Sequence, residues 1–286
     1  MARDADKKSR VIIKTEFILR TLGLTLIVLA QVSYAGKLDS YYGNLDSYQG
    51  NDLRSRIKAV ISKSHHGRSY SDLFEAYFDG DIDKTYEGDL SIVDIYSEDP
   101  ITKDPYTFES INQKCGSYRG ESNCFNREHL FPQSVFHKRS PMRSDYYHVF
   151  PTDGYVNGKR SNYPFGEVSN PEWSSRNGSK LGSNSISGYN GRVFEPIDEF
   201  KGDVARALLY FGTRYEDNLR SFKNYPMLDK SSGKFYSKWF LEMLLRWHKQ
   251  DPVSEYEQNR NEAGFRFQGN RNPYVDHPEW VERAYQ

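Results

Sequence analysis

The stretch that decides the fold reads CFNREHLFPQS from Cys124 to Ser134 and SDYYHVFPTDGYVNGKRSNYPFGE from Ser144 to Glu167. It gathers a carboxylate, an imidazole, an amide and several cations into one polar segment. These groups suit metal-assisted attack on a phosphodiester, in which a cation stabilises charge and a base activates water. The segment therefore predicts a catalytic centre rather than a purely structural region.

The chemistry of each side chain suggests its role in such a centre. Glu128 can bind a hard cation, and Asn157 can supply a neutral oxygen ligand to the same ion. His129 can take a proton from water, because an unperturbed imidazole pKa of roughly 6.5 suits a general base near pH 7. The cations that we expect to contact phosphate are Arg127, Lys159, Arg160 and Arg143.

These residues resemble the endonuclease I family, whose site is a ββα-metal (His-Me) finger. The matching stretches are residues 126–129, 148–151, 156–162, 202–215 and 268–274. Together they carry the resemblance over most of the chain, from about Leu53 to Trp280. The resemblance implies a secreted, largely sequence-nonspecific nuclease that depends on Mg²⁺ or Ca²⁺ and leaves 5′-phosphate ends.

The family arrangement also implies where the site lies in the fold. Glu128 and His129 would stand at the end of one strand, and a second strand near residues 146–150 would pair with it. A helix starting near Thr152 or Asp153 would carry Asn157. Consecutive strand residues point to opposite faces, so the first strand must end or distort at the Glu-His pair.

The chain departs from one pattern of the resembled family. Some members have a glutamate fourteen residues before the metal-binding asparagine, and here that position is Arg143. Asp145 lies close by, and whether it compensates is left open. The cation that would touch the transition state is also open among Lys138, Arg139 and Arg143.

The N-terminus has the pattern of a secretory signal peptide. Basic residues lead into an apolar run from Leu22 to Ala30, and small residues at Ser33 and Ala35 predict cleavage after Ala35. An uncleaved anchor is the alternative, but the run is well short of the roughly 20 residues that a spanning helix needs. We therefore expect a secreted or periplasmic protein without stable membrane insertion. Its parts would be a signal (1–35), a polar lead-in (36–52) and a nuclease domain (53–286).

Charge is unevenly spread along the chain. The whole sequence has 39 Lys/Arg against 39 Asp/Glu, and residues 1–35 hold six of the former and three of the latter. The cleaved chain would carry a net charge of −3, which excludes a broadly basic nucleic-acid coat. Residues 114–160, however, contain eight basic and four acidic side chains, whereas 79–104 is acidic. A local positive field at the predicted site is compatible with a nuclease.

Cys115 and Cys124 are the two cysteines of the chain. In an exported protein an even count favours one disulfide, which would close a short loop just before Glu128. Two buried free thiols are the alternative. Zinc is not expected, because two thiols nine residues apart lack the usual ligand spacing.

The remaining pattern predicts a helix-rich α+β class in a single mixed domain. Apolar periodicity predicts helices over 51–63, 203–215 and 238–249, and a further helix from the Asp251-Pro252 start to about Phe267. Residues 70–78 read as a helical turn, 91–96 as a strand and 165–192 as a long loop. We expect His148 to be structural, and Gln268 to Asn272 to be either a polar turn or a supporting hydrogen-bond motif.

Two functional interpretations follow. The first is an exported endonuclease acting as a monomer on DNA and on RNA. The second is a secreted noncatalytic module that binds nucleic acid or glycans through its many tyrosines. The trio of Glu128, His129 and Asn157 separates them, because a binding module needs no general base beside a metal ligand.

Overall fold

The computed structural model describes residues 36–231 and 234–285. The chain divides into two compact units, residues 1–47 and residues 48–286. Of the first unit, residues 36–47 are described, with helical backbone over 36–42. The expected signal peptide at 1–35 lies outside the described residues. Within the described residues, no helix has the length and apolar character needed to cross a membrane.

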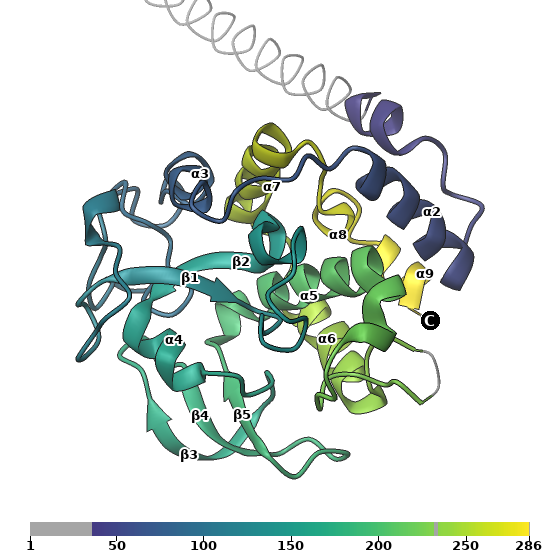
Figure 1. The fold of residues 1–286 in the computed structure, drawn as a ribbon. Coiled ribbons are helices and arrows are strands. Elements are labelled where there is room, and N and C mark those ends of the chain that lie inside the picture. Colours follow the sequence, from purple (N-terminus) through teal and green to yellow (C-terminus); the bar gives the residue numbers. More distant parts are fainter. Residues whose placement is uncertain (1–35, 232–233, 286) are drawn as a thin grey trace, which may run out of the picture. The chain divides into compact units, whose positions relative to one another are not determined.

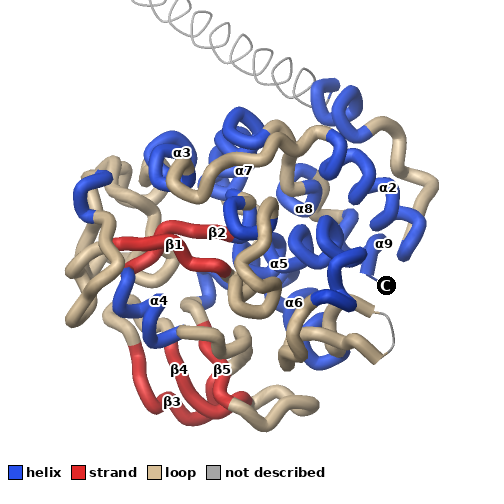
Figure 2. The backbone as a smooth tube through the Cα atoms, in the orientation of Figure 1, coloured by secondary structure: helices blue, strands red, loops and turns tan. Residues whose placement is uncertain are grey.

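The second unit is a helix-rich α+β structure with two small antiparallel sheets, as the sequence predicts. Figure 2 shows both sheets toward one side of this unit and most helices toward the other. Its helices are α2 (Gly50–Lys63), α3 (Leu73–Gly80), α4 (Gly154–Arg160), α5 (Lys201–Tyr215), α6 (Lys238–Gln250), α7 (Glu255–Gln268), α8 (Pro273–Asp276) and α9 (Trp280–Tyr285). Its strands are β1 (Phe125–His129), β2 (Val149–Asp153), β3 (Val168–Ser174), β4 (Lys180–Asn184) and β5 (Arg192–Glu195).

Strands β1 and β2 and helix α4 form one continuous substructure (Figure 1). The strands are antiparallel, with Glu128 opposite Phe150 and His129 opposite Val149. Helix α4 follows β2 directly because the Asp153 side chain accepts hydrogen bonds from the backbone N–H groups of Tyr155 and Val156. This is an N-cap, which satisfies the free donors of the first turn.

The second strand begins later than expected. Residues Tyr146–His148 form a 3₁₀ turn rather than strand, and β2 starts at Val149. The side chain of Asp145 accepts a hydrogen bond from the backbone N–H of Tyr147, which stabilises the turn in place of a ladder. The turn places the ring of His148 beside that of His129, with 5.7 Å between their centroids.

Helix α5 is the centre of the hydrophobic core. Nearly every side chain along it is buried, and it packs against α2 and α6. A helix surrounded on all sides in this way also has to satisfy its polar groups internally. Arg206 does so by donating to the carboxylate of Glu257 on α7 and to the backbone carbonyl of Asp251.

The prediction of a long loop over 165–192 is wrong. This region contains β3 and β4, which pair with β5 in a three-stranded antiparallel sheet. Its Gly, Ser and Asn content hid the strands, and one glycine is required by the pairing itself. A Cβ atom at Gly182 would lie 2.2 Å from the backbone oxygen of Asn170, so only glycine lets the strands approach.

The expected strand over 91–96 is also wrong, since only Ile92 makes a bridge, to Ile82. The carboxylate of Asp94 accepts from the backbone N–H of Tyr96, the hydroxyl of Ser97 and the backbone N–H of Asp153. Such local side-chain bonds compete with a strand ladder. The alternation of residue types therefore marks a buried, irregular segment.

The four predicted helices are present, but α7 begins at Glu255 rather than just after Asp251. Ser254 and Glu257 form a capping box at its start. The carboxylate of Asp251 instead accepts from the backbone N–H of Gly202, at the beginning of α5. The residue that looks like the cap of one helix therefore serves another.

Candidate active site

A pocket of about 300 Å³ opens beside β1 and the C-terminal half of α4. It is lined by Tyr70, Phe74, Cys115, Gly116, Asn126, Arg127, Glu128, His129, Pro132, Gln133, Asn157, Arg160, Ser161 and Asn162. The structure thus brings together five of the seven residues that the sequence singles out for catalysis or substrate binding. Lys159 and Arg143 do not line the pocket.

Glu128 is buried on β1 and pairs with a cation of the protein itself. Its Oε1 lies 2.9 Å from the Nη1 atom of Arg160 and accepts a hydrogen bond of 3.1 Å from the Tyr96 hydroxyl. Burial raises the pKa of Glu128 to about 7, while the charge of Arg160 and the bond from Tyr96 act in the opposite direction. Both contacts converge on Oε1, which leaves Oε2 as the oxygen for another partner.

Arg160 is almost entirely buried, with an exposed fraction of 1%. Besides Glu128, its guanidinium donates to the backbone carbonyls of His129 and Leu130, at 2.9 and 2.6 Å. A contact between Arg160 and phosphate stays a prediction, and it requires one of these bonds to give way. What the structure shows is a cation that fixes the end of β1.

His129 is buried and, like Glu128, lines the pocket. Its Nε2 lies 3.0 Å from the backbone carbonyl of Arg143, and its ring packs near those of Tyr70 and His148. Burial, followed by the charge of His148, lowers the pKa of His129 well below 6.5. The imidazole is therefore neutral at pH 7, and a carbonyl at Nε2 makes that nitrogen the protonated one.

Asn157 presents a half-buried amide from α4 to the same pocket. Its Nδ2 donates to the Oδ1 atom of Asn126 on β1, at 2.7 Å. The donor end of the amide is thus occupied, and its acceptor end is left for another partner. With Oε2 of Glu128, the pocket offers two oxygens of the kind that hard cations prefer, so the side chains fit a magnesium or calcium ion.

Two aromatic rings at the pocket rim hold cations on their faces. The guanidinium of Arg127 lies 3.5 Å from the centroid of Tyr70 and 4.2 Å from that of Phe74. Arg143 lies 4.3 Å from the Tyr70 centroid, and Lys114 5.0 Å from that of Phe74. Cations near an aromatic face are attracted by its quadrupole, so the rim concentrates positive charge beside the pocket.

The remaining expected phosphate contact, Lys159, is half-buried on α4. Its ammonium lies 5.2 Å from the centroid of Tyr155 and 5.9 Å from that of Trp173 on β3. It stands outside the pocket lining, on the neighbouring surface formed by α4 and the second sheet.

The predicted disulfide is present between Cys115 and Cys124, with their Cα atoms 5.7 Å apart. The backbone N–H of Cys115 also donates to the carbonyl of Phe125, the first residue of β1. Cys115 and Gly116 line the pocket. The bridge therefore fixes one wall of the pocket and the entry to the strand that carries Glu128.

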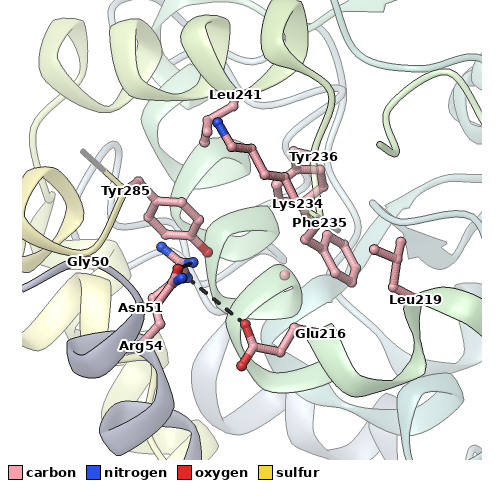
Figure 3. A pocket seen from close by; sticks show the side chains of 11 residues that line it. Gly50, Asn51, Arg54, Glu216, Leu219, Lys234, Phe235, Tyr236, Leu241 and Tyr285 are labelled. Atoms are coloured by element: carbon pink, nitrogen blue, oxygen red, sulfur yellow. Dashed lines mark hydrogen bonds and ion pairs between the residues drawn. The ribbon is translucent and has the colours of Figure 1, made fainter. Parts of the chain in front are cut away.

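A larger cavity of about 470 Å³ lies elsewhere in the unit, between α2, the end of α5 and the C-terminal residues (Figure 3). Arg54 and Glu216 face each other across it, 3.9 Å apart, beside the ring of Tyr285. It contains none of the residues that the sequence marks for chemistry. Size alone therefore does not identify the active site.

Residues 49–279 match the Endonuclease I family. The chain belongs to the endonuclease I family. It is therefore a nuclease, which hydrolyses phosphodiester bonds, and the members of this family are typically metal-dependent.

Relatives in the endonuclease I family carry names that refer to RNA and to DNA. The chain is 33% identical to an extracellular ribonuclease of Bacillus amyloliquefaciens over 240 residues, which are 82% of this chain and 73% of the relative. It is 31% identical to an extracellular ribonuclease of Bacillus subtilis, over 82% and 74% of the two chains. A periplasmic deoxyribonuclease of Aeromonas hydrophila is 26% identical, over 57% and 56%.

Two further residues, Tyr70 and Tyr96, contact Arg127 and Glu128 from outside the motif and have no signal in the sequence. Neither has a distinguishing neighbour, so only the fold reveals them. A role for Asn126 could have been predicted, because it belongs to the Asn-Arg-Glu-His motif; in the structure it accepts a hydrogen bond from Asn157.

The open question about Asp145 receives a structural answer. Asp145 is fully buried and accepts hydrogen bonds from the hydroxyls of Tyr210 and Tyr215 and from the Nε2 atom of Gln268. It therefore supports the core beneath the 3₁₀ turn and is not part of the pocket lining. Gln268 and Asn270 belong to this supporting network, so that motif is more than a polar turn.

Proposed function

We propose that this nuclease is exported and that it cuts DNA and RNA internally, with little sequence preference, through a ββα-metal (His-Me) finger. The β1-β2-α4 order and the single pocket holding Glu128, His129 and Asn157 support this assignment. One observation carries the proposal. The neutral imidazole of His129, hydrogen-bonded to a backbone carbonyl, shares a pocket with the side-chain oxygens of Glu128 and Asn157, which suit a hard cation.

In this proposal Glu128 and Asn157 hold one Mg²⁺ or Ca²⁺ ion through Oε2 and the amide oxygen. When bound, the ion supplies a Lewis acid for a phosphate oxygen and for the leaving 3′ oxygen. Arg160 is a positioning residue, because its bonds to Glu128 and to two carbonyls fix where the carboxylate lies.

His129 acts as the general base. Its Nε2–H donates to the carbonyl of Arg143, so the lone pair is on Nδ1 and takes a proton from the attacking water. Arg127 and Arg143, held against Tyr70, then face the phosphate, and Lys159 contacts the strand farther along. Contacts of this kind position the backbone and carry no base identity, which explains the absence of sequence preference.

Substrate range and location follow the relatives as part of the same proposal. Their names include ribonucleases and deoxyribonucleases that are extracellular or periplasmic. We propose export through a signal at residues 1–35 and action as a monomer.

The test is direct incubation of the purified protein with plasmid DNA and with RNA, in Mg²⁺, in Ca²⁺ and in chelator. We expect fragments of both nucleic acids with a metal and none with chelator, and ends without a shared motif. Intact substrates in every condition, or a fixed motif of several bases at the cut sites, would contradict the proposal.

A further inference from the structure

Three carboxylates meet in the acidic segment between α3 and β1, outside the candidate active site. Ligand oxygens of Glu87, Glu98 and Asp104 all lie within 4.8 Å of one another. Glu87 is exposed, Asp104 is half-buried and Glu98 is buried. The segment is largely irregular and lies at the outer side of β1 (Figure 1), so the three side chains approach one another through folding of a loop.

Glu98 is the unusual member of this group. Its exposed fraction is 1%, and among the described residues no N–H or hydroxyl group donates to either of its oxygens; its polar contact is the carboxyl of Asp104. A buried ionised carboxylate without a partner is costly, and buried polar groups in native proteins are nearly always satisfied. The side chain is instead directed at two further carboxylates, which makes its burial harder to explain without a positive charge.

Neighbouring acids in the same segment behave differently. The carboxylate of Asp83 accepts from the backbone N–H groups of residues 85, 86, 88 and 89. That of Asp99 accepts from the backbone of Ile101 and from the backbone and hydroxyl of Thr102. These acids stabilise turns, so acidity alone does not explain the group formed by Glu98 and its two neighbours.

We propose that Glu87, Glu98 and Asp104 form a second divalent-cation site, of the calcium class, whose role is structural rather than catalytic. All three ligands are oxygens, and no histidine or cysteine belongs to the group, which disfavours zinc and other softer ions. The site is separate from Glu128 and Asn157 and does not depend on the reaction proposed for them.

The ligand set suits calcium. Ca²⁺ takes six to eight oxygens at about 2.3–2.6 Å in flexible geometry, which oxygens lying within 4.8 Å of one another on an irregular loop can supply. Mg²⁺ instead requires near-octahedral geometry at about 2.0–2.1 Å. A cavity of about 630 Å³, lined by Glu87 and Asp104 among others, gives water access to complete the coordination shell.

The raised pKa values of Glu98 and Asp104 also reflect the close approach of the carboxylates. Burial, followed by the charges of Asp104 and Glu87, raises the pKa of Glu98 to about 10. Burial likewise raises the pKa of Asp104 to about 6. Without a cation the group has to retain a proton at neutral pH, and a divalent ion relieves the same repulsion.

The segment that carries these ligands also supports the active site. Tyr96, two residues before Glu98, donates its hydroxyl to Glu128. Asp94 accepts from the backbone N–H of Asp153 at the start of α4, and the Nδ2 atom of Asn177 donates to the carbonyl of Glu98. An ion at this site therefore stabilises the backbone from which Tyr96 orients the catalytic carboxylate.

The test compares calcium-dependent thermal stability in four purified full-length proteins: wild type, Glu98→Gln, Asn157→Ala and Glu109→Gln. Glu109 is an exposed acid of the same segment and provides a charge-matched control. At calcium about 100-fold above Kd, we expect the Tm to rise by roughly 5–10 °C in wild type, Asn157→Ala and Glu109→Gln. In Glu98→Gln most of this rise should be lost, the remainder coming from calcium in the active site, whereas its Tm in chelator should equal or exceed that of wild type.

Terbium luminescence, sensitised by tyrosines such as Tyr86 at the cavity, provides an independent measurement. We expect two calcium-displaceable sites in wild type and one in either Glu98→Gln or Asn157→Ala. The proposal is overturned if wild type shows no calcium-dependent rise, or if Glu98→Gln keeps the full rise. It is also overturned if Asn157→Ala alone abolishes the rise, because calcium would then bind only in the active site.

Discussion

Glu128 and Glu98 are two glutamates with the same exposed fraction, 1%, in opposite electrostatic surroundings. Glu128 has a guanidinium and a phenolic hydroxyl at one of its oxygens. Glu98 lies instead beside the carboxylates of Glu87 and Asp104, with ligand oxygens within 4.8 Å of one another. The comparison shows that burial by itself does not define the role of an acid, which depends on whether the protein supplies the compensating charge.

The pKa values express the same difference. Burial raises both, to about 7 for Glu128 and to about 10 for Glu98. For Glu128 the neighbours oppose the effect of burial, whereas for Glu98 they add to it. Glu128, whose charge is balanced by the protein, can bind an ion that also contacts the substrate. Glu98, whose neighbours repel it, is stabilised by an ion bound to its own group.

The largest expected effect is a loss of catalysis without a loss of stability. His129→Ala should lower the cleavage rate by ~10²–10⁴-fold, because the general base is lost. The Tm and the binding of nucleic acid should change little. A plasmid-cleavage time course measures the rate. His137→Asn is the matched control, since His137 is exposed and asparagine tolerates its positive φ of 59°. Near-wild-type cleavage by His129→Ala would remove His129 from the mechanism.

Removing the guanidinium of Arg160 should leave the carboxylate of Glu128 without the positive charge that balances it. Arg160→Met leaves a buried carboxylate and two carbonyls without their donor, and breaking a buried pair costs about 3–5 kcal/mol. We expect the free energy of unfolding in urea to fall accordingly. Arg192→Met, which disrupts the exposed pair with Glu172, should have little effect. Equal stability of the two variants would show that Arg160 does not compensate Glu128.

Metal dependence distinguishes the two proposed cation sites by activity. Asn157→Ala should raise the Mg²⁺ concentration for half-maximal cleavage by at least about tenfold, because losing even a group that only orients a ligand costs about 10–100-fold. Glu98→Gln should leave that concentration nearly unchanged at 25 °C. The measurement is a metal titration of the initial rate. An unchanged titration for Asn157→Ala would place the catalytic ion elsewhere.

The smallest expected effect concerns pH and stability in chelator. The folded pKa of Glu98, about 10, exceeds its ordinary value of 4.5, so the folded state binds the extra proton between these limits. Its contribution to stability is complete below pH 4.5 and is lost as the pH rises toward 10. Glu98→Gln has no such titration, so its Tm advantage over wild type should grow by a few degrees between pH 5 and pH 9.

Glu109→Gln should run parallel to wild type over the same pH range. If Glu98→Gln also runs parallel, the carboxylate of Glu98 is solvated or paired in solution, and its contrast with Glu128 disappears.

Local pattern in the sequence determined much of this protein. Apolar spacing gave the helices α2, α5, α6 and α7 nearly within their bounds, because a helix buries a continuous stripe of neighbours three and four residues apart. The Asn-Arg-Glu-His motif and Asn157 indicated the pocket, since these residue types in that order serve one chemistry. The two cysteines indicated their own disulfide.

Tertiary structure decided the rest, because charge compensation and strand pairing depend on segments distant in sequence. Arg160 is a typical phosphate-binding residue by type, and only the fold shows that it is bound to Glu128. Strands β3 to β5 depend on an approach permitted by Gly182, which composition conceals. The meeting of Glu87, Glu98 and Asp104 likewise arises from the path of an irregular loop, for which the sequence has no periodic signal.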